Sequence, residues 1–119
     1  MVGIQDSGES RMIDVLMAVA LYSAQGSMAA VNSSRDAFSK CLRDATQQAK
    51  ASKITVDAFP AFALEQCAAA EAKFKSALVT FDVSNKISRR QAEEDAKAQI
   101  DDYIASSKDN YEMVLKRGG

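Results

Sequence analysis

Apolar and small side chains recur at intervals of three and four residues along three long stretches of the chain. This spacing places them on one face of an α-helix, because a helix completes a turn in about 3.6 residues. The first stretch covers residues 28–52, and its face carries Val31, Ser34, Phe38, Cys41, Leu42, Ala45, Ala49 and Ser52. Each such face has to be buried against another element, so the pattern restricts the chain to helices that pack on one another.

The second stretch follows a short interruption at residues 52–57. Its face carries Phe59, Ala63, Cys67, Ala70, Phe74, Ala77, Leu78 and Phe81. Thr55 is a candidate N-cap, and Pro60 predicts a distorted opening turn followed by a regular helix from about residue 60. At the far end, Asn85 can adopt the left-handed conformation that ends many helices.

A capping box opens the third stretch. The Ser88 hydroxyl is expected to accept a hydrogen bond from the first turn, and the Gln91 side chain to reach back to Ser88. The face then continues through Ala96, Ile100, Tyr103, Ser107, Tyr111 and Val114. Short loops make successive helices antiparallel. The sequence therefore predicts an all-α domain over residues 27–119, folded as an antiparallel three-helix bundle.

Residues 1–26 form a separate segment with an apolar run of about ten residues, which is shorter than the 20 or so that span a bilayer. The run has the length of a signal-peptide core, and Ala24 and Gly26 fit a cleavage site of small residues. Asp14 inside the run is instead typical of an amphipathic surface helix. The segment is therefore either an export leader or an additional N-terminal helix.

The only two cysteines, Cys41 and Cys67, lie at equal distances from Ile54, where the first helical hairpin is expected to turn. The same register sets Phe38 opposite Ala70, so a bulky ring meets a small partner. We predict a Cys41–Cys67 disulfide that closes a loop of about 25 residues. Two buried thiols in a reducing compartment are the alternative. A catalytic pair is disfavoured because the chain has no C-x-x-C motif.

Several functional classes find little support in the composition. The 15 basic and 16 acidic residues give a net charge of −1, which argues against binding to nucleic acid. The chain has no histidine, the commonest general base and a frequent metal ligand, and no glycine-rich phosphate loop. Acidic residues at 93–95 and 101–102 are adjacent on a helix and point in different directions, so they do not converge on a metal ion. We expect neither enzyme activity nor a cofactor.

Basic residues gather around the start of the third stretch. The candidate patch for an anionic partner consists of Lys73, Lys75, Lys86, Arg89 and Arg90. Positive charge at a helix N-terminus opposes the helix dipole, and an anionic partner is one explanation for the position of the last two. The alternative is local pairing with the glutamates at 93 and 94, four residues further along the helix.

Residues 38–103 resemble small exported helical proteins of bacteria that have no assigned function. The resemblance rests on a cysteine in each of two helices, an "FDV-x-N" turn and an "SR-x-x-A-x-x-D" helix start. It implies an exported, all-helical protein of the bacterial cell envelope, and it implies no particular activity.

Two functions fit these expectations. The first is a non-enzymatic, disulfide-stapled helical bundle, periplasmic or secreted, that acts through contacts with a protein or with an anionic envelope surface and does not span the membrane. The second is a cytoplasmic helical adaptor that forms a homodimer through the apolar segment at residues 12–22.

Overall fold

The computed structural model describes residues 27–118, and every regular element in that part of the chain is a helix. The helices are α2 (Met28–Ala51), α3 (Phe59–Gln66), α4 (Ala68–Ser84) and α5 (Arg89–Gly118). The prediction that this part of the chain is all-helical is confirmed. The expectations for residues 1–26, including the leader and the dimerisation segment at 12–22, lie outside the described residues.

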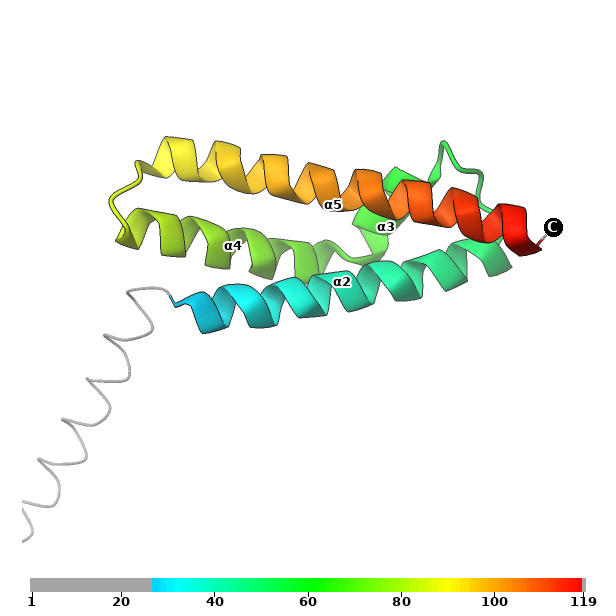
Figure 1. Ribbon diagram of the computed structural model, residues 1–119, viewed down its shortest axis with the longest axis horizontal. Coiled ribbons are helices and arrows are strands. Elements are labelled where there is room, and N and C mark those ends of the chain that lie inside the picture. Colours follow the sequence, from blue (N-terminus) through cyan, green and yellow to red (C-terminus); the bar gives the residue numbers. More distant parts are fainter. Residues whose placement is uncertain (1–26, 119) are drawn as a thin grey trace, which may run out of the picture.

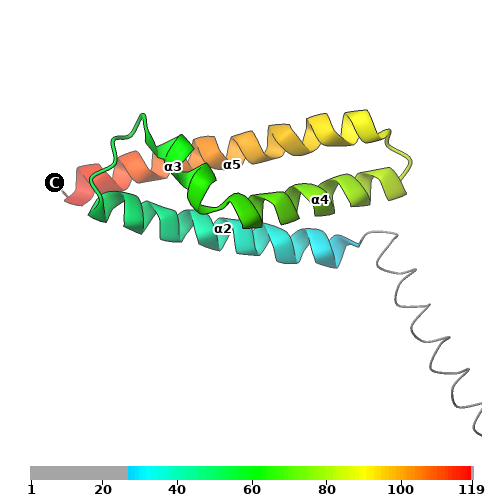
Figure 2. The same cartoon turned by 180° about the vertical axis from the view of Figure 1, so that it is seen from behind.

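The chain runs out along α2, back through α3 and α4, and out again along α5 (Figure 1). Helix α4 packs against both α2 and α5, and α3 occupies the equivalent position between the other ends of α2 and α5. Seen from behind, α3 is tilted away from the axis of α4 (Figure 2). The second pass of the chain therefore consists of two short helices where the sequence predicts one long helix.

The buried core receives side chains from all four helices. At its centre the rings of Phe38 and Phe74 lie 5.8 Å apart, and Tyr103 approaches them edge-on at 6.0 and 5.6 Å. Edge-to-face contacts of this kind add to the free energy of burying the rings. On α5, Ile104 is buried although it lies outside the predicted face. The core thus uses a wider stripe of α5 than the spacing indicated.

Local hydrogen bonds explain where the first two helices begin. The Ala30 N–H donates to the Ser27 hydroxyl at 3.0 Å, which caps α2. The Ala58 N–H donates to Thr55 Oγ1 at 3.2 Å within the turn that precedes α3. Pro60 then occupies the first turn of α3. The expected distorted opening is confirmed, but Thr55 stabilises that turn and does not cap the helix.

Two expectations about the second helical stretch are wrong. The helix is interrupted at Cys67, whose φ of −110° and ψ of 22° are not helical. At the C-terminal end, Asn85 has a φ of −102°, and the left-handed residue is Lys86, with a φ of 74°. Asn85 instead donates its side-chain amide to the Phe81 carbonyl at 2.8 Å, which satisfies one of the last carbonyls of α4.

The predicted cap of α5 is present in part. The Gln91 N–H donates to the Ser88 hydroxyl at 3.2 Å, as expected. The Gln91 side chain turns the other way and donates to Asp95 at 2.8 Å. Arg90 pairs with Glu94 at 3.7 Å, which offsets part of the unfavourable position of its charge. The start of α5 is therefore stabilised by the Ser88 hydroxyl and by contacts along the helix.

The aromatic contacts predict a large loss of stability on truncation of Phe74, which is fully buried. The substitution Phe74→Ala should lower the free energy of unfolding by about 3–5 kcal/mol, because it removes the ring and leaves a cavity beside two other rings. Urea denaturation followed by circular dichroism measures the change. As a control, Leu64→Ala on α3 should cost under about 1 kcal/mol, because Leu64 is 38% exposed. Equal losses in the two variants would contradict this description of the core.

Candidate functional site

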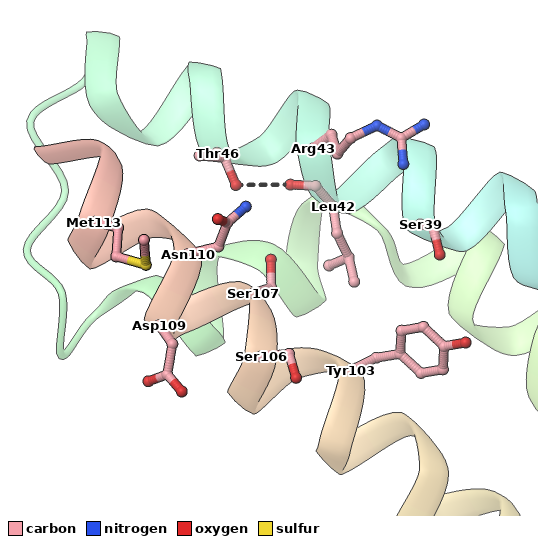
Figure 3. A pocket seen from close by; sticks show the side chains of 10 residues that line it. All are labelled: Ser39, Leu42, Arg43, Thr46, Tyr103, Ser106, Ser107, Asp109, Asn110 and Met113. Atoms are coloured by element: carbon pink, nitrogen blue, oxygen red, sulfur yellow. Dashed lines mark hydrogen bonds between the residues drawn. The ribbon is translucent and has the colours of Figure 1, made fainter. Parts of the chain in front are cut away.

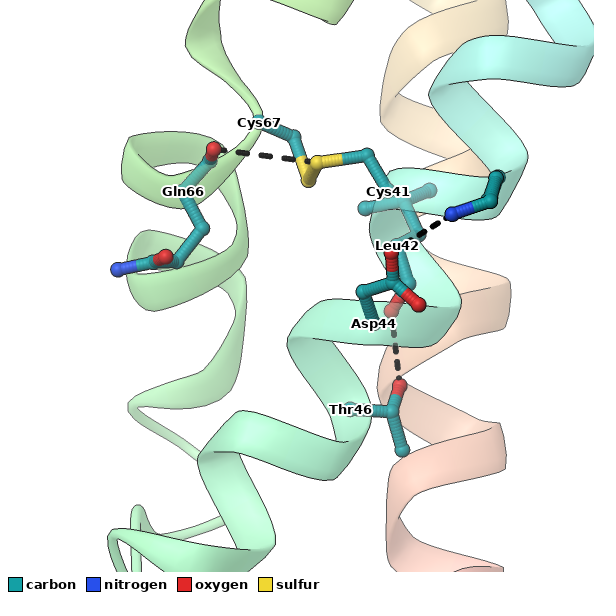
Figure 4. The surroundings of a disulfide bond; sticks show 7 residues. Cys41, Leu42, Asp44, Thr46, Gln66 and Cys67 are labelled. Atoms are coloured by element: carbon teal, nitrogen blue, oxygen red, sulfur yellow. Dashed lines mark hydrogen bonds and ion pairs between the residues drawn. A yellow bond between two sulfur atoms is a disulfide. The ribbon is translucent and has the colours of Figure 1, made fainter.

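A disulfide joins Cys41 in the middle of α2 to Cys67 at the junction of α3 and α4 (Figure 4). The two Cα atoms are 5.8 Å apart, within the range that a disulfide requires. Cys67 is buried and Cys41 is partly exposed. The predicted pairing is confirmed, and it is the one covalent link between the first and second passes of the chain within residues 27–118.

The surroundings of the disulfide are closely packed. Cys41 Sγ lies 3.8 Å from the carbonyl oxygen of Gln66. A disulfide sulfur carries no proton, so this approach is a packing contact and not a hydrogen bond. One turn further along α2, the buried Thr46 hydroxyl donates to the Leu42 carbonyl at 3.0 Å. The buried Thr46 side chain near the bridge therefore has its hydrogen bond within the protein.

A shallow groove of about 490 Å³ runs between α2 and α5 (Figure 3). Leu42 and Thr46 are the buried residues of its lining. The rest of the lining comes from both helices: Ser39, Arg43, Tyr103, Ser106, Ser107, Asp109, Asn110 and Met113. Its two charged side chains have opposite signs and point outward in Figure 3, so the groove offers no field of a single sign to a ligand.

Sequence reasoning did not find this groove. Short serine side chains on the facing surfaces of α2 and α5 line it, and the spacing places only one of them, Ser107, on a predicted buried face. The arrangement can form hydrogen bonds and apolar contacts with a bound chain. Among residues 27–118, no three histidine, cysteine or acidic side chains lie close enough together to hold a metal ion.

Tyr111 attaches the loop at residues 52–58 to α5. Its hydroxyl donates to the Ile54 carbonyl at 2.6 Å, and its ring stacks on Phe59 with a centroid separation of 4.7 Å. The residue is fully buried, and this burial raises the pKa of the Tyr111 phenol above its ordinary value. The contact joins positions 57 residues apart in the chain, and no local pattern in the sequence indicates it.

The five residues of the candidate basic patch, Lys73, Lys75, Lys86, Arg89 and Arg90, are all exposed. Lys75 and Arg89 line one hollow between α4 and α5, together with Glu93. Lys73 lies two positions before Lys75, roughly 200° around the helix, and so occupies a different side of α4. The structure brings together only part of the patch and interleaves it with acidic groups. Binding of an anionic partner here stays a prediction.

Comparisons of the chain with protein-family models, characterised proteins and solved structures found no match. The resemblance to small exported helical proteins of bacteria therefore stays a prediction. Within residues 27–118, none of the helices combines the length and the apolar character that a membrane span requires.

The hydrogen bond to Ile54 gives a direct test of how the loop is held. Tyr111→Phe should lower the free energy of unfolding by about 1–3 kcal/mol, because it keeps the ring stacked on Phe59 but leaves a partly buried carbonyl without its donor. Thermal and urea denaturation measure the change.

Tyr103→Phe is the matched control, because the Tyr103 hydroxyl makes no hydrogen bond within residues 27–118 and the ring is partly exposed. This variant should change the stability by less than about 0.5 kcal/mol. If Tyr111→Phe lowered the free energy of unfolding no more than Tyr103→Phe does, the Tyr111 hydroxyl would not be what holds the loop.

Proposed function

We propose that residues 27–118 form an antiparallel three-helix bundle, with α3 and α4 together as the second rod, that works as a non-enzymatic binding module of the bacterial cell envelope. The observation that carries the proposal is the disulfide between Cys41 and Cys67. Disulfides persist in the periplasm and outside the cell, where the environment is oxidising, and are rare in the cytosol. The bridge therefore favours an exported protein over a cytoplasmic one.

The contribution of the bridge to stability also favours an oxidising compartment. Five of the buried core residues are alanines, Ala45, Ala49, Ala63, Ala92 and Ala96, which bury little apolar area each. Small domains with limited cores commonly depend on disulfides for stability. Closing a loop of about 25 residues contributes on the order of 3 kcal/mol. A large share of the stability would be lost in a reducing compartment.

The mode of action that fits these surfaces is contact with another macromolecule. The groove between α2 and α5 combines hydroxyl, amide and apolar groups, which suits a polypeptide segment better than a small charged ligand. The exposed cations of α4 and α5 add a second contact surface for an anionic partner. The absence of histidine from the sequence supports a binding role over a catalytic one.

A cytoplasmic adaptor that dimerises through residues 12–22 is the second candidate. The observation that favours it is Asp14 within the apolar run, together with acidic residues before the run, where export signals usually carry positive charge. On this alternative the cysteines would be reduced in the cell and the N-terminal segment retained.

Intact mass spectrometry of the native protein distinguishes the two. Protein isolated from its own cellular fraction, with free thiols blocked during lysis, should be lighter than the reduced chain by two hydrogen atoms and should take up thiol reagent only after reduction. Cleavage after residue 26 would further support export. A full-length cytoplasmic chain with two thiols blocked at lysis would overturn the proposal. Oxidised protein refolded in air is the mass standard for the bridged form.

A further inference from the structure

Helices α3 and α4 are separated by a single residue, Cys67. Its ψ of 22° departs from the helical value of about −42°. The backbone hydrogen bonds on both sides of it are helical: the Cys67 N–H donates to Ala63 at 2.9 Å, and the Glu71 N–H donates to Cys67 at 2.8 Å. The break is therefore a change in the torsion angles at one residue and not an inserted loop.

The local sequence does not explain this break. Residues 64–71 read LEQCAAAE, and leucine, glutamate, glutamine and alanine are among the strongest helix formers. The segment contains no glycine or proline and no asparagine, aspartate or serine that could cap a helix end. On propensity alone, α3 and α4 would form one continuous helix.

The burial pattern does not require the break either. On one uninterrupted helix, the buried residues Phe59, Ala63, Cys67, Phe74 and Leu78 would fall within an arc of roughly 100°. Val79, which is also buried, lies about 100° further round, but it directly follows Leu78 within α4 and keeps that position whether or not the helix is broken. A single straight helix would therefore present the same side chains to the core. The remaining distinctive property of the residue at the break is its covalent bond to Cys41 on α2.

We propose that the Cys41–Cys67 disulfide holds the helix broken at Cys67, and that its reduction lets α3 and α4 join into one helix. The bridge would then be a redox-sensitive joint as well as a stabilising cross-link. This inference depends on the bridge alone and not on the compartment or partner proposed above.

The opening of the joint is a thiol–disulfide exchange with a dithiol reductant. One thiolate of the reductant attacks Cys41 Sγ, the partly exposed sulfur, and the Sγ–Sγ bond breaks with Cys67 leaving as a thiolate that takes up a proton. The second thiol of the reductant then displaces Cys41, which leaves protonated. Two electrons and two protons pass to the cysteines, and the reductant is released as its own disulfide.

The joint is linked to the end of the molecule where α2, α3 and α5 meet. Helix α3 carries Phe59, whose ring stacks on Tyr111, and the Tyr111 hydroxyl holds Ile54 in the loop before α3. Because α3 is tilted relative to α4 (Figure 2), alignment of the two helices would move Phe59 relative to Tyr111. Reduction would therefore alter the loop at residues 52–58 as well as the helix junction.

Nuclear magnetic resonance of the full chain tests the joint directly. The three-bond coupling between the amide and α protons of residue 67 reports φ, and the Cα chemical shifts of residues 66–68 report helix. In the oxidised protein we expect a large coupling and a non-helical shift at Cys67. After addition of dithiothreitol, the coupling should fall and all three shifts should become helical.

The variant Cys41→Ser is the matched control, because it removes the bridge and keeps a cysteine at position 67. It should give the helical values in the absence of reductant, whereas Lys40→Ala, beside the bridge, should leave the oxidised values unchanged. Non-helical values at residue 67 in both unbridged forms would overturn the proposal. Loss of the dispersed spectrum in both would also overturn it, because the joint requires a folded reduced state. Neither result bears on the proposed function, because that proposal is tested separately by the mass measurement on native protein.

Discussion

The covalent bond between Cys41 and Cys67 determines where α2 meets the second pass of the chain, and the two aromatic groups of the core lie on either side of that point. Phe38, Phe74 and Tyr103 pack on the side of the α4–α5 turn, and Phe59 stacks on Tyr111 on the side of the loop at residues 52–58. The buried positions between them include Ala45, Ala49 and Ala63. Small side chains let the helices approach closely enough for the bridge but contribute little burial energy.

This division of roles explains why a modest core can order four helices. The rings supply apolar area at both ends, and the bridge limits the conformations of the unfolded chain. The Tyr111 hydroxyl adds a third constraint, because it attaches the loop before α3 to the end of α5. The outer faces carry salt bridges that are mostly exposed, such as Lys97 with Asp101 at 2.8 Å, and such pairs contribute little to stability. The fold therefore depends on a few internal contacts and not on its surface ion pairs.

The sequence predicted the helical faces, the cysteine pairing and the Ser88 cap because each rests on spacing within one helix or across one hairpin. It did not predict the break at Cys67, where a cross-link to another helix overrides strong local propensity. The left-handed residue was placed one position early, since Lys86 and not Asn85 adopts it. The Tyr111–Ile54 bond and the groove between α2 and α5 both arise from parts of the chain far apart in sequence, which periodicity alone does not bring together.

Equilibrium unfolding in urea with and without a dithiol reductant tests most directly whether the bridge has this central role. The oxidised protein should be more stable than the reduced protein by about 2–4 kcal/mol, because the cross-link lowers the entropy of the unfolded chain. Far-ultraviolet circular dichroism before the transition should show that the reduced form is still helical. Equal free energies of unfolding for the two forms would contradict the account.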